Sequence, residues 1–280
     1  MKFGLFYQIQ VPKPWTEDSE SKRIWEALEQ ITYAEEMGYE SVWFSEHHFR
    51  PVWSHHSAPD LTLAAASQRT YKLRMGIGVV LTPIHHPLHA AARMATLDIL
   101  SKGRVDVGLG RTGYPYQLTP YGSGLEDTRG MWEEFAEVLP QAWTQEVTSY
   151  DGTYFKIPPR EVLPKPVQKP HPPIFVGGEL NAATRRIANY GDGWLPRARN
   201  TSQYQDPAKL SSARRHIEEL MTARGRDISN LNVTMWDAPH DRDMNRRFFD
   251  AGADRVVHML NTTDEKSAYE DLERVAEAVL

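Results

Sequence analysis

Two adjacent histidines, His47 and His48, are the residues of this chain whose type and position most clearly indicate chemistry. They close an apolar run that begins at Val42 and predicts a β-strand, and side chains on a strand alternate between its two faces. One imidazole should therefore face inward at the carboxyl end of the strand, where a group that exchanges protons near neutral pH is useful. The alternative is that both histidines are ordinary packing or surface residues.

The elements that must position these histidines alternate along almost the whole chain. Short apolar runs are separated by amphipathic helical patterns, as in βαβ units that build a parallel sheet. Eight such units predict an α/β fold, a (β/α)8 TIM barrel in which residues 1–280 form a single domain. The predicted strands are residues 3–7, 41–45, 73–80, 104–109, 174–177, 193–195, 231–235 and 255–259.

Two segments depart from this alternation. Residues 150–173 contain seven prolines after Asp151-Gly152, which predicts a hairpin followed by an extended connector before the fifth strand. We expect this connector to lie over the outside of the barrel as a spacer. After the seventh strand, residues 235–240 lead almost directly into a helix, which predicts a short loop there.

Composition narrows the possible functions. The net charge of -5, with basic and acidic residues interspersed, argues against nucleic-acid binding. The absence of cysteine excludes disulfides, thiolate metal sites and a cysteine nucleophile, and fits a reducing, cytoplasmic setting. No run of about 18 apolar residues and no export leader is found, so we expect no membrane association.

The stretch Gly108-Leu-Gly-Arg-Thr-Gly113 matches the dinucleotide-binding pattern G-x-G-x-x-G. The pattern requires the glycines to open a helix, whereas residues 114–122 contain two prolines and are not expected to form one. We therefore reject a dinucleotide site. The glycines, Gly110 among them, would instead leave room for a flat ligand, with Arg111 beside it.

A candidate phosphate site follows the predicted fifth strand. Gly177 and Gly178 precede a helix, so backbone N–H groups from about Glu179 to Ala182 would point out of the helix N-terminus towards an anion. Arg111 on a neighbouring strand end could complete the cradle. The alternative is an ordinary turn with Asn181 as the helix cap.

Together these motifs resemble the bacterial-luciferase-like family of flavin-dependent oxidoreductases. The resemblance is carried in order by residues 1–6, Glu46-His-His-Phe49, residues 82–87, residues 97–104, residues 176–178 and Gly191-Asp-Gly-Trp194. It implies that His47 is the active-site histidine, Glu46 its neighbouring carboxylate and His48 a supporting partner.

The resemblance also implies the residues that hold the cofactor. It implies a cis peptide bond at Gly78-Val79 beneath the flavin ring, and it aligns Gly110 with the luciferase cysteine. It further implies phosphate contacts from Arg111 and from Gly178, Glu179 and Leu180, although many relatives have serine where Leu180 stands.

The implied activity is that of a monooxygenase that uses reduced FMN and O2 to oxygenate a small organic substrate through a flavin hydroperoxide. Reduced FMN would come from a separate NAD(P)H flavin reductase, and the chain would form a homodimer. Hydride transfer with a deazaflavin coenzyme and a non-catalytic flavin-binding partner subunit are the alternatives. A metal hydrolase, prompted by the pairs His47-His48, His55-His56 and His85-His86, is disfavoured because adjacent histidines diverge on a strand.

Other polar residues have structural interpretations. His55 and His56 are expected to line the barrel mouth, His86-Pro87 to begin the third helix, and Asp98 to pair with Arg104. The tyrosine-rich segment of residues 114–125 is expected to cover the site in place of the long seventh-strand insertion typical of the family.

Overall fold

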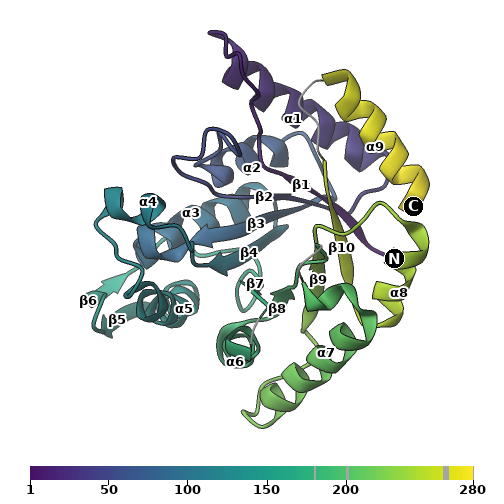
Figure 1. Ribbon diagram of the computed structural model, residues 1–280. Helices are drawn as coiled ribbons and strands as arrows, with labels where there is room; N and C mark the ends of the chain where they lie inside the picture. Colours follow the sequence, from purple (N-terminus) through teal and green to yellow (C-terminus); the bar gives the residue numbers. More distant parts are fainter. Residues whose placement is uncertain (180, 200–201, 261–264, 280) are drawn as a thin grey trace.

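A closed barrel of eight parallel strands forms the centre of the computed structural model (Figure 1). The structure describes residues 1–179, 181–199, 202–260 and 265–279. The predicted TIM barrel is confirmed, with β10 pairing in parallel with β1 to close it. In order around the barrel, the strands are β1 (Phe3–Tyr7), β2 (Ser41–Phe44), β3 (Arg74–Leu81), β4 (Val105–Gly110), β7 (Ile174–Gly177), β8 (Gly193–Leu195), β9 (Asn232–Trp236) and β10 (Arg255–Met259).

Helices surround the barrel, and their first residues explain where several of them begin (Figure 1). Proline opens α2, α3 and α7, where its missing N–H costs nothing. Asp206 and Asp241 cap α7 and α8 by accepting backbone N–H groups. The helices are α1 (Ser19–Glu36), α2 (Pro59–Ser67), α3 (Pro87–Leu100), α5 (Thr128–Thr144), α6 (Asn181–Tyr190), α7 (Pro207–Thr222), α8 (Arg242–Asp250) and α9 (Glu265–Val279), with 3-10 turns η1 (Thr82–Ile84) and η3 (Gln203–Gln205).

The apolar core has two layers, as expected for parallel strands that are buried on both faces. One layer fills the space between the sheet and the helices. The other fills the inside of the barrel and consists of Phe6, Trp43, Phe175, Leu195, Trp236, Val257 and Met259. This inner cluster closes the barrel below its carboxyl end, so ligands of the mouth must lie above it.

The proline-rich segment is more than a spacer. It begins with the predicted hairpin, β5 (Val147–Asp151) and β6 (Lys156–Glu161), whose turn donates three backbone N–H groups to Glu134 on α5. Further on, Gln168 binds Asp98 and the Val105 carbonyl. The connector is therefore anchored to the barrel at the amino end of β4.

The segment after β4 also differs from its prediction. Residues 115–121, expected to be non-helical, form the short helix α4 (Pro115–Leu118) and the 3-10 turn η2 (Thr119–Tyr121). Each proline lies at the start of its turn, where helical geometry tolerates it. The loop after β9 is short, as predicted, because α8 begins at Arg242. Within the described part of the chain, no helix has the length and apolar character needed to span a bilayer.

Candidate functional site

The chain just after β2 forms the centre of the candidate site. His48 Nε2 donates to Glu46 Oε1 at 2.7 Å, and His85, which follows η1, donates from Nε2 to the same oxygen at 2.6 Å. The strand geometry assumed for His47 and His48 is wrong, because β2 ends at Phe44 and the chain then turns. This turn lets Glu46 and His48 meet, and His85 joins them from the loop after β3.

The Glu46 carboxylate organises this network. It is 3% exposed, and its Oε2 accepts the backbone N–H of Leu81 at 2.9 Å. Burial alone would raise the pKa of Glu46, but the hydrogen bonds from the two imidazoles and this amide lower it to about 2. The group is ionised at neutral pH and therefore orients the imidazoles by accepting from both.

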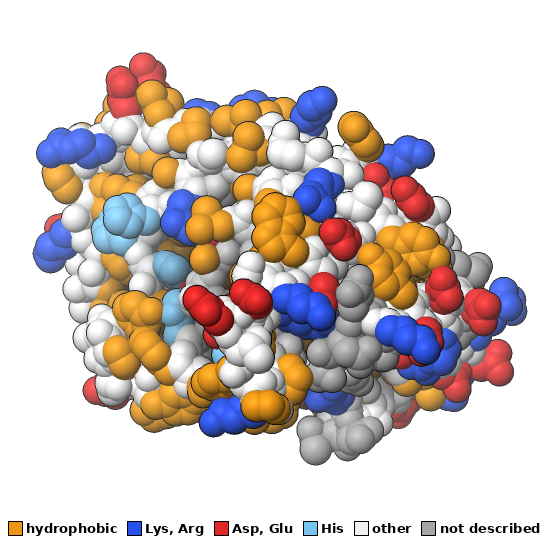
Figure 2. All heavy atoms as spheres, turned by 90° about the horizontal axis from the view of Figure 1, so that it is seen from above, with side chains coloured by type: hydrophobic (Ala, Val, Ile, Leu, Met, Phe, Trp, Pro, Cys, Tyr) orange, Lys and Arg blue, Asp and Glu red, His pale blue; other side chains and the backbone are white. Residues whose placement is uncertain are grey.

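The segment of residues 112–125 covers this network. The Tyr121 hydroxyl lies 2.7 Å from His48 Nδ1, the ring nitrogen that does not contact Glu46, and donates to it when Nε2 carries the hydrogen bonded to Glu46. Gln117 Oε1 accepts the His48 backbone N–H at 3.0 Å. On the face shown in Figure 2, histidine side chains lie among hydrophobic ones. The contacts from Tyr121 and Gln117 place this segment over the end of β2, as a cover would be.

His47 has a different environment from His48. Its backbone N–H donates to the His56 carbonyl at 3.0 Å, while its ring Nδ1 is buried and makes no hydrogen bond among the described residues. Burial, with a smaller contribution from the Arg50 guanidinium, lowers the pKa of His47 to about 4. The imidazole is therefore neutral at pH 7 and is able to accept a proton.

The bond between Gly78 and Val79 is a cis peptide, at the position that the resemblance implies. A Cβ added to Gly110 would lie 2.2 Å from Val79 Cγ2, and one added to Gly177 would lie 3.4 Å from Val79 Cγ1. These glycines therefore make room for the Val79 side chain. The expectation that Gly110 leaves open space for a flat ligand is wrong, because Val79 fills that space.

The turn after β7 is held by two side chains from neighbouring segments. Trp194 Nε1 donates to the Gly178 carbonyl at 2.9 Å, and the Tyr204 hydroxyl donates to the Glu179 carbonyl at 2.9 Å. Gly178 has a φ of +127°, a conformation that favours glycine. With both carbonyls bound, the turn leads into the N-terminus of α6, where free backbone N–H groups attract anions. Leu180, also predicted to contact phosphate, lies outside the described residues.

Arg111 lies close to a second arginine that the sequence did not indicate. Arg111 is exposed and donates from Nη1 to Thr128 Oγ1 at 3.2 Å. Arg186, on α6, is mostly buried over the Trp132 ring. Its Nε makes no hydrogen bond among the described residues and lies 4.0 Å from Glu133 Oε1, a long ion pair. Burial, and next the Arg111 charge, lower the pKa of Arg186. Two neighbouring guanidinium groups of this kind suit an anionic ligand.

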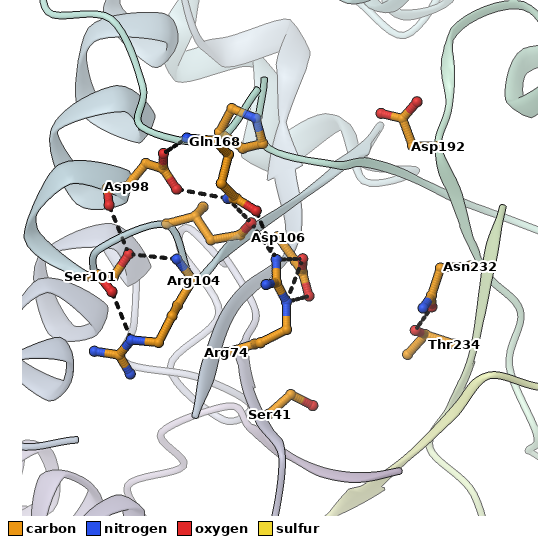
Figure 3. Close-up of polar contacts among 12 residues, drawn as sticks. Ser41, Arg74, Asp98, Ser101, Arg104, Asp106, Gln168, Asp192, Asn232 and Thr234 are labelled. Carbon is orange, nitrogen blue, oxygen red and sulfur yellow. Dashed lines mark hydrogen bonds and ion pairs between the residues drawn. The ribbon is translucent and has the colours of Figure 1, made fainter. Parts of the chain in front are cut away.

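The opposite, amino end of the barrel carries a separate polar network (Figure 3). Asp106 is 1% exposed and forms ion pairs with Arg74 and with Arg255. The predicted pairing of Asp98 with Arg104 is wrong, because Asp98 accepts from Gln168 (Figure 3). Arg104 instead donates to several groups of the neighbouring loops, which are Ser67 O, Thr70 O, Thr70 Oγ1, Leu73 O and Ser101 O.

The remaining histidines have structural roles. His55 pairs with Glu20, and His56 is buried with its Nε2 bonded to Thr62 Oγ1 at 2.8 Å. Their loop bonds to Ile9 and His47, beyond the carboxyl ends of β1 and β2, but the two rings have structural partners. His86 caps α3 by accepting the Leu88 N–H, in agreement with its prediction. Across the residues that the structure describes, no group of three or more His, Asp or Glu side chains is arranged to hold a metal ion.

The sequence is similar to proteins of several bacteria. An uncharacterised protein of Mycobacterium tuberculosis is 34% identical over 78% of this chain and 74% of its own length. The F420-dependent hydroxymycolic acid dehydrogenase of the same species is 33% identical over 71% of this chain and 54% of its own. The oxygenase component of the flavin-dependent trigonelline monooxygenase of Acinetobacter baylyi is 28% identical over 63% of this chain and 48% of its own.

A solved structure shares the fold, and a family model matches the sequence. The monooxygenase RslO1 of Streptomyces bottropensis superposes with a TM-score of 0.83 and 22% identity, covering 99% of this chain and 98% of that one. Residues 1–238 match the family described as luciferase-like monooxygenase. The chain therefore belongs to the luciferase-like monooxygenase family.

Proposed function

We propose that this protein is a flavin-dependent monooxygenase that uses reduced FMN and O2 to oxygenate a small organic substrate. The observation that carries the proposal is the Glu46 network, which fixes two imidazoles beside His47 at one end of a luciferase-like barrel. A neutral histidine with a free buried nitrogen suits a reaction in which a proton must be accepted near a bound ligand.

The residues of the mouth fit a flavin. Its phosphate would bind at Gly178, Glu179 and the N-terminus of α6, with charge from Arg111 and Arg186, whose Nε makes no hydrogen bond among the described residues. Its ring would lie above Val79, which Gly110 and Gly177 accommodate. When bound, the flavin would supply the redox chemistry with O2.

The chain's own residues would then manage protons and exclude water. His47 accepts a proton, and its low pKa keeps it ready to do so at neutral pH. Glu46 holds His48 and His85 by hydrogen bonds and acts as a positioning residue. The cover formed by residues 112–125 limits access of water to the end of β2.

The proposed reaction also requires a source of reduced flavin. Reduced FMN would come from a separate NAD(P)H flavin reductase, in keeping with the Acinetobacter relative that is named as an oxygenase component. The active form would be a homodimer. A second candidate, hydride transfer with a deazaflavin, is favoured by the F420-dependent mycobacterial relative.

The test compares the two coenzymes on the purified chain. With FMN and a flavin reductase, we expect oxygen uptake that rises when aldehydes, ketones or aromatic compounds are added, together with a product that carries one atom from 18O2. Anaerobic turnover with deazaflavin and no incorporation of 18O would show the second candidate instead. Binding of FMN without either activity would indicate a non-catalytic partner subunit.

A further inference from the structure

Two arginines lie just beyond β8 on the inner side of the barrel. Leu195, the last residue of β8, belongs to the inner cluster together with Trp236. Arg197 is paired with Trp236 in a parallel bridge, and residues paired across neighbouring strands point to the same face. Arg197 therefore points into the mouth, above the inner cluster.

Arg199 lies on the same side, two residues further on. Its Nη2 is 3.7 Å from the sulfur of Met259, which also belongs to the inner cluster. The side chains of Arg197 and Arg199 are 56% and 44% exposed, respectively. Both guanidinium groups are thus attached to the wall of the mouth and still open to a ligand.

A single buried carboxylate holds this pair in place. Asp237, directly after β9, forms an ion pair with Arg199 Nε and a longer one with Arg197 Nη2 at 3.8 Å. Its side chain is 8% exposed, and its φ of +58° turns it away from the strand direction. One carboxylate faces two guanidinium groups, so the cluster retains one positive charge, and each guanidinium offers five donors.

The residues around Arg197 and Arg199 indicate which kind of ligand the remaining positive charge would bind. Beneath the arginines lie Trp236 and Met259, and the Trp236 ring is 4.1 Å from that of Phe6 between centroids. The Glu46 carboxylate already accepts hydrogen bonds from His48 and His85. Glu179 follows β7, the strand next to β8 in the barrel order. A ligand with an anionic group and an apolar body matches positive donors above an aromatic floor.

We propose that Arg197 and Arg199 form an anion subsite in the mouth that selects substrates bearing a carboxylate. This inference rests on the proposed function, because it assigns the substrate class of the same site. The cofactor phosphate is accounted for by Arg111, Arg186 and the turn after β7, which leaves the Arg197 and Arg199 pair for the substrate. Asp237 is a positioning residue in this subsite.

The experiment is a binding titration on the full chain loaded with FMN, followed by tryptophan fluorescence. Benzoate is compared with benzamide, which has the same ring and no charge. Because hydrogen bonds to charged groups contribute most to such discrimination, we expect benzoate to bind about ten- to a hundredfold more tightly. Arg197→Gln with Arg199→Gln should abolish this preference.

Two further variants keep the test decisive if the double variant does not fold. Arg197→Gln alone leaves Asp237 paired with Arg199 and should weaken the benzoate preference about tenfold. Arg215→Gln removes an exposed arginine of α7 on the outside of the barrel and should leave the preference unchanged. Equal binding of both probes by the unaltered chain, or no binding of either, would overturn the proposal.

The cofactor and the reaction are tested separately. If the Arg197 and Arg199 variants lose affinity for FMN while benzoate binding is unchanged, the arginines serve the cofactor and the substrate assignment is wrong. A benzoate preference in a chain that shows no oxygen uptake with reduced FMN would contradict the proposed function and leave the subsite intact. Oxygen uptake without any benzoate preference would contradict only the subsite.

Discussion

The amino and carboxyl ends of the barrel both carry ion pairs between aspartate and arginine, but these ion pairs have different roles. At the amino end, Asp106 is buried between Arg74 and Arg255, and its charge is compensated there. At the carboxyl end, Arg197 and Arg199 share one carboxylate and remain about half exposed. Each end therefore places two arginines on one carboxylate, and the difference between the ends is burial. The side chains of Arg74 and Arg255 are 29% and 5% exposed and serve the fold, whereas the half-exposed arginines of the carboxyl end can also reach a ligand.

The largest expected effect comes from breaking the amino end. Asp106→Ala leaves Arg74 and Arg255 without their shared carboxylate and should lower the free energy of unfolding by about 3 to 5 kcal/mol. Urea denaturation measures this change. Asp151→Ala, which removes an exposed partner of Lys156, is the control and should cost under about 1 kcal/mol. Similar losses for both variants would contradict the role given to the amino end.

Removing His47 should lower activity and leave the stability of the fold nearly unchanged. His47→Ala deletes the proposed proton acceptor while leaving Asp106 and its partners intact, so turnover with reduced FMN should fall about a hundredfold or more. FMN affinity and the urea midpoint should stay close to those of the unaltered chain. Product formation at the original rate would refute the role of His47.

The two ends should also differ in how they change the free energy of unfolding as the pH falls. Burial lowers the pKa of both His47 and His56 to about 4, so their neutral forms favour the folded state. Their contribution to the free energy of unfolding is fully present above the unfolded pKa of about 6.5 and is lost as the pH falls from there to about 4. For the deeply buried His56, this loss amounts to up to about 3 kcal/mol. The Arg255 and Arg74 guanidinium groups overcome burial and lower the pKa of Asp106, which keeps its charge through this range.

Urea midpoints measured from pH 7 to pH 4 would show this loss. His56→Gln should make the dependence between pH 6.5 and pH 4 less steep, because the substituted side chain does not titrate. His47 and the buried His258, whose pKa burial also lowers to about 4, would still contribute. An equally steep dependence in that variant would show that other groups dominate the acid response.

The smallest effect is expected at the phosphate turn. Arg186→Gln should weaken FMN binding about tenfold, because Arg111 and the backbone N–H groups of α6 would still bind the phosphate. Equilibrium dialysis with FMN measures the change, and Arg215→Gln, which removes an exposed arginine of α7, serves as the control. Weakening that is equal in both variants would argue against a phosphate contact from Arg186.

Much of the fold could be predicted because its signal is local. Each barrel strand is a short apolar run, and the prolines and aspartates at helix starts mark where helices begin. Residues 115–121 were mispredicted because the position of a proline within a turn decides whether it breaks a helix, and the sequence alone did not fix that position.

The site could be predicted only where the family resemblance indicated it. That resemblance placed the cis bond at Gly78-Val79, which is confirmed, and pointed to Glu46. Tyr121 and His85 were missed because they reach Glu46 and His48 through tertiary contacts between separate loops. Arg197 and Arg199 had a readable signal, since two arginines spaced by two residues follow a strand end, on the face that a barrel turns inward.

Val79 and the glycines around it have a consequence for how this protein can diversify. Any side chain at Gly110 would collide with Val79, since a Cβ there lies 2.2 Å from Cγ2. Positions 79 and 110 therefore share one volume. A larger residue at position 110, such as the cysteine that the resemblance aligns with it, requires the Val79 side chain to move or to be replaced by a smaller one.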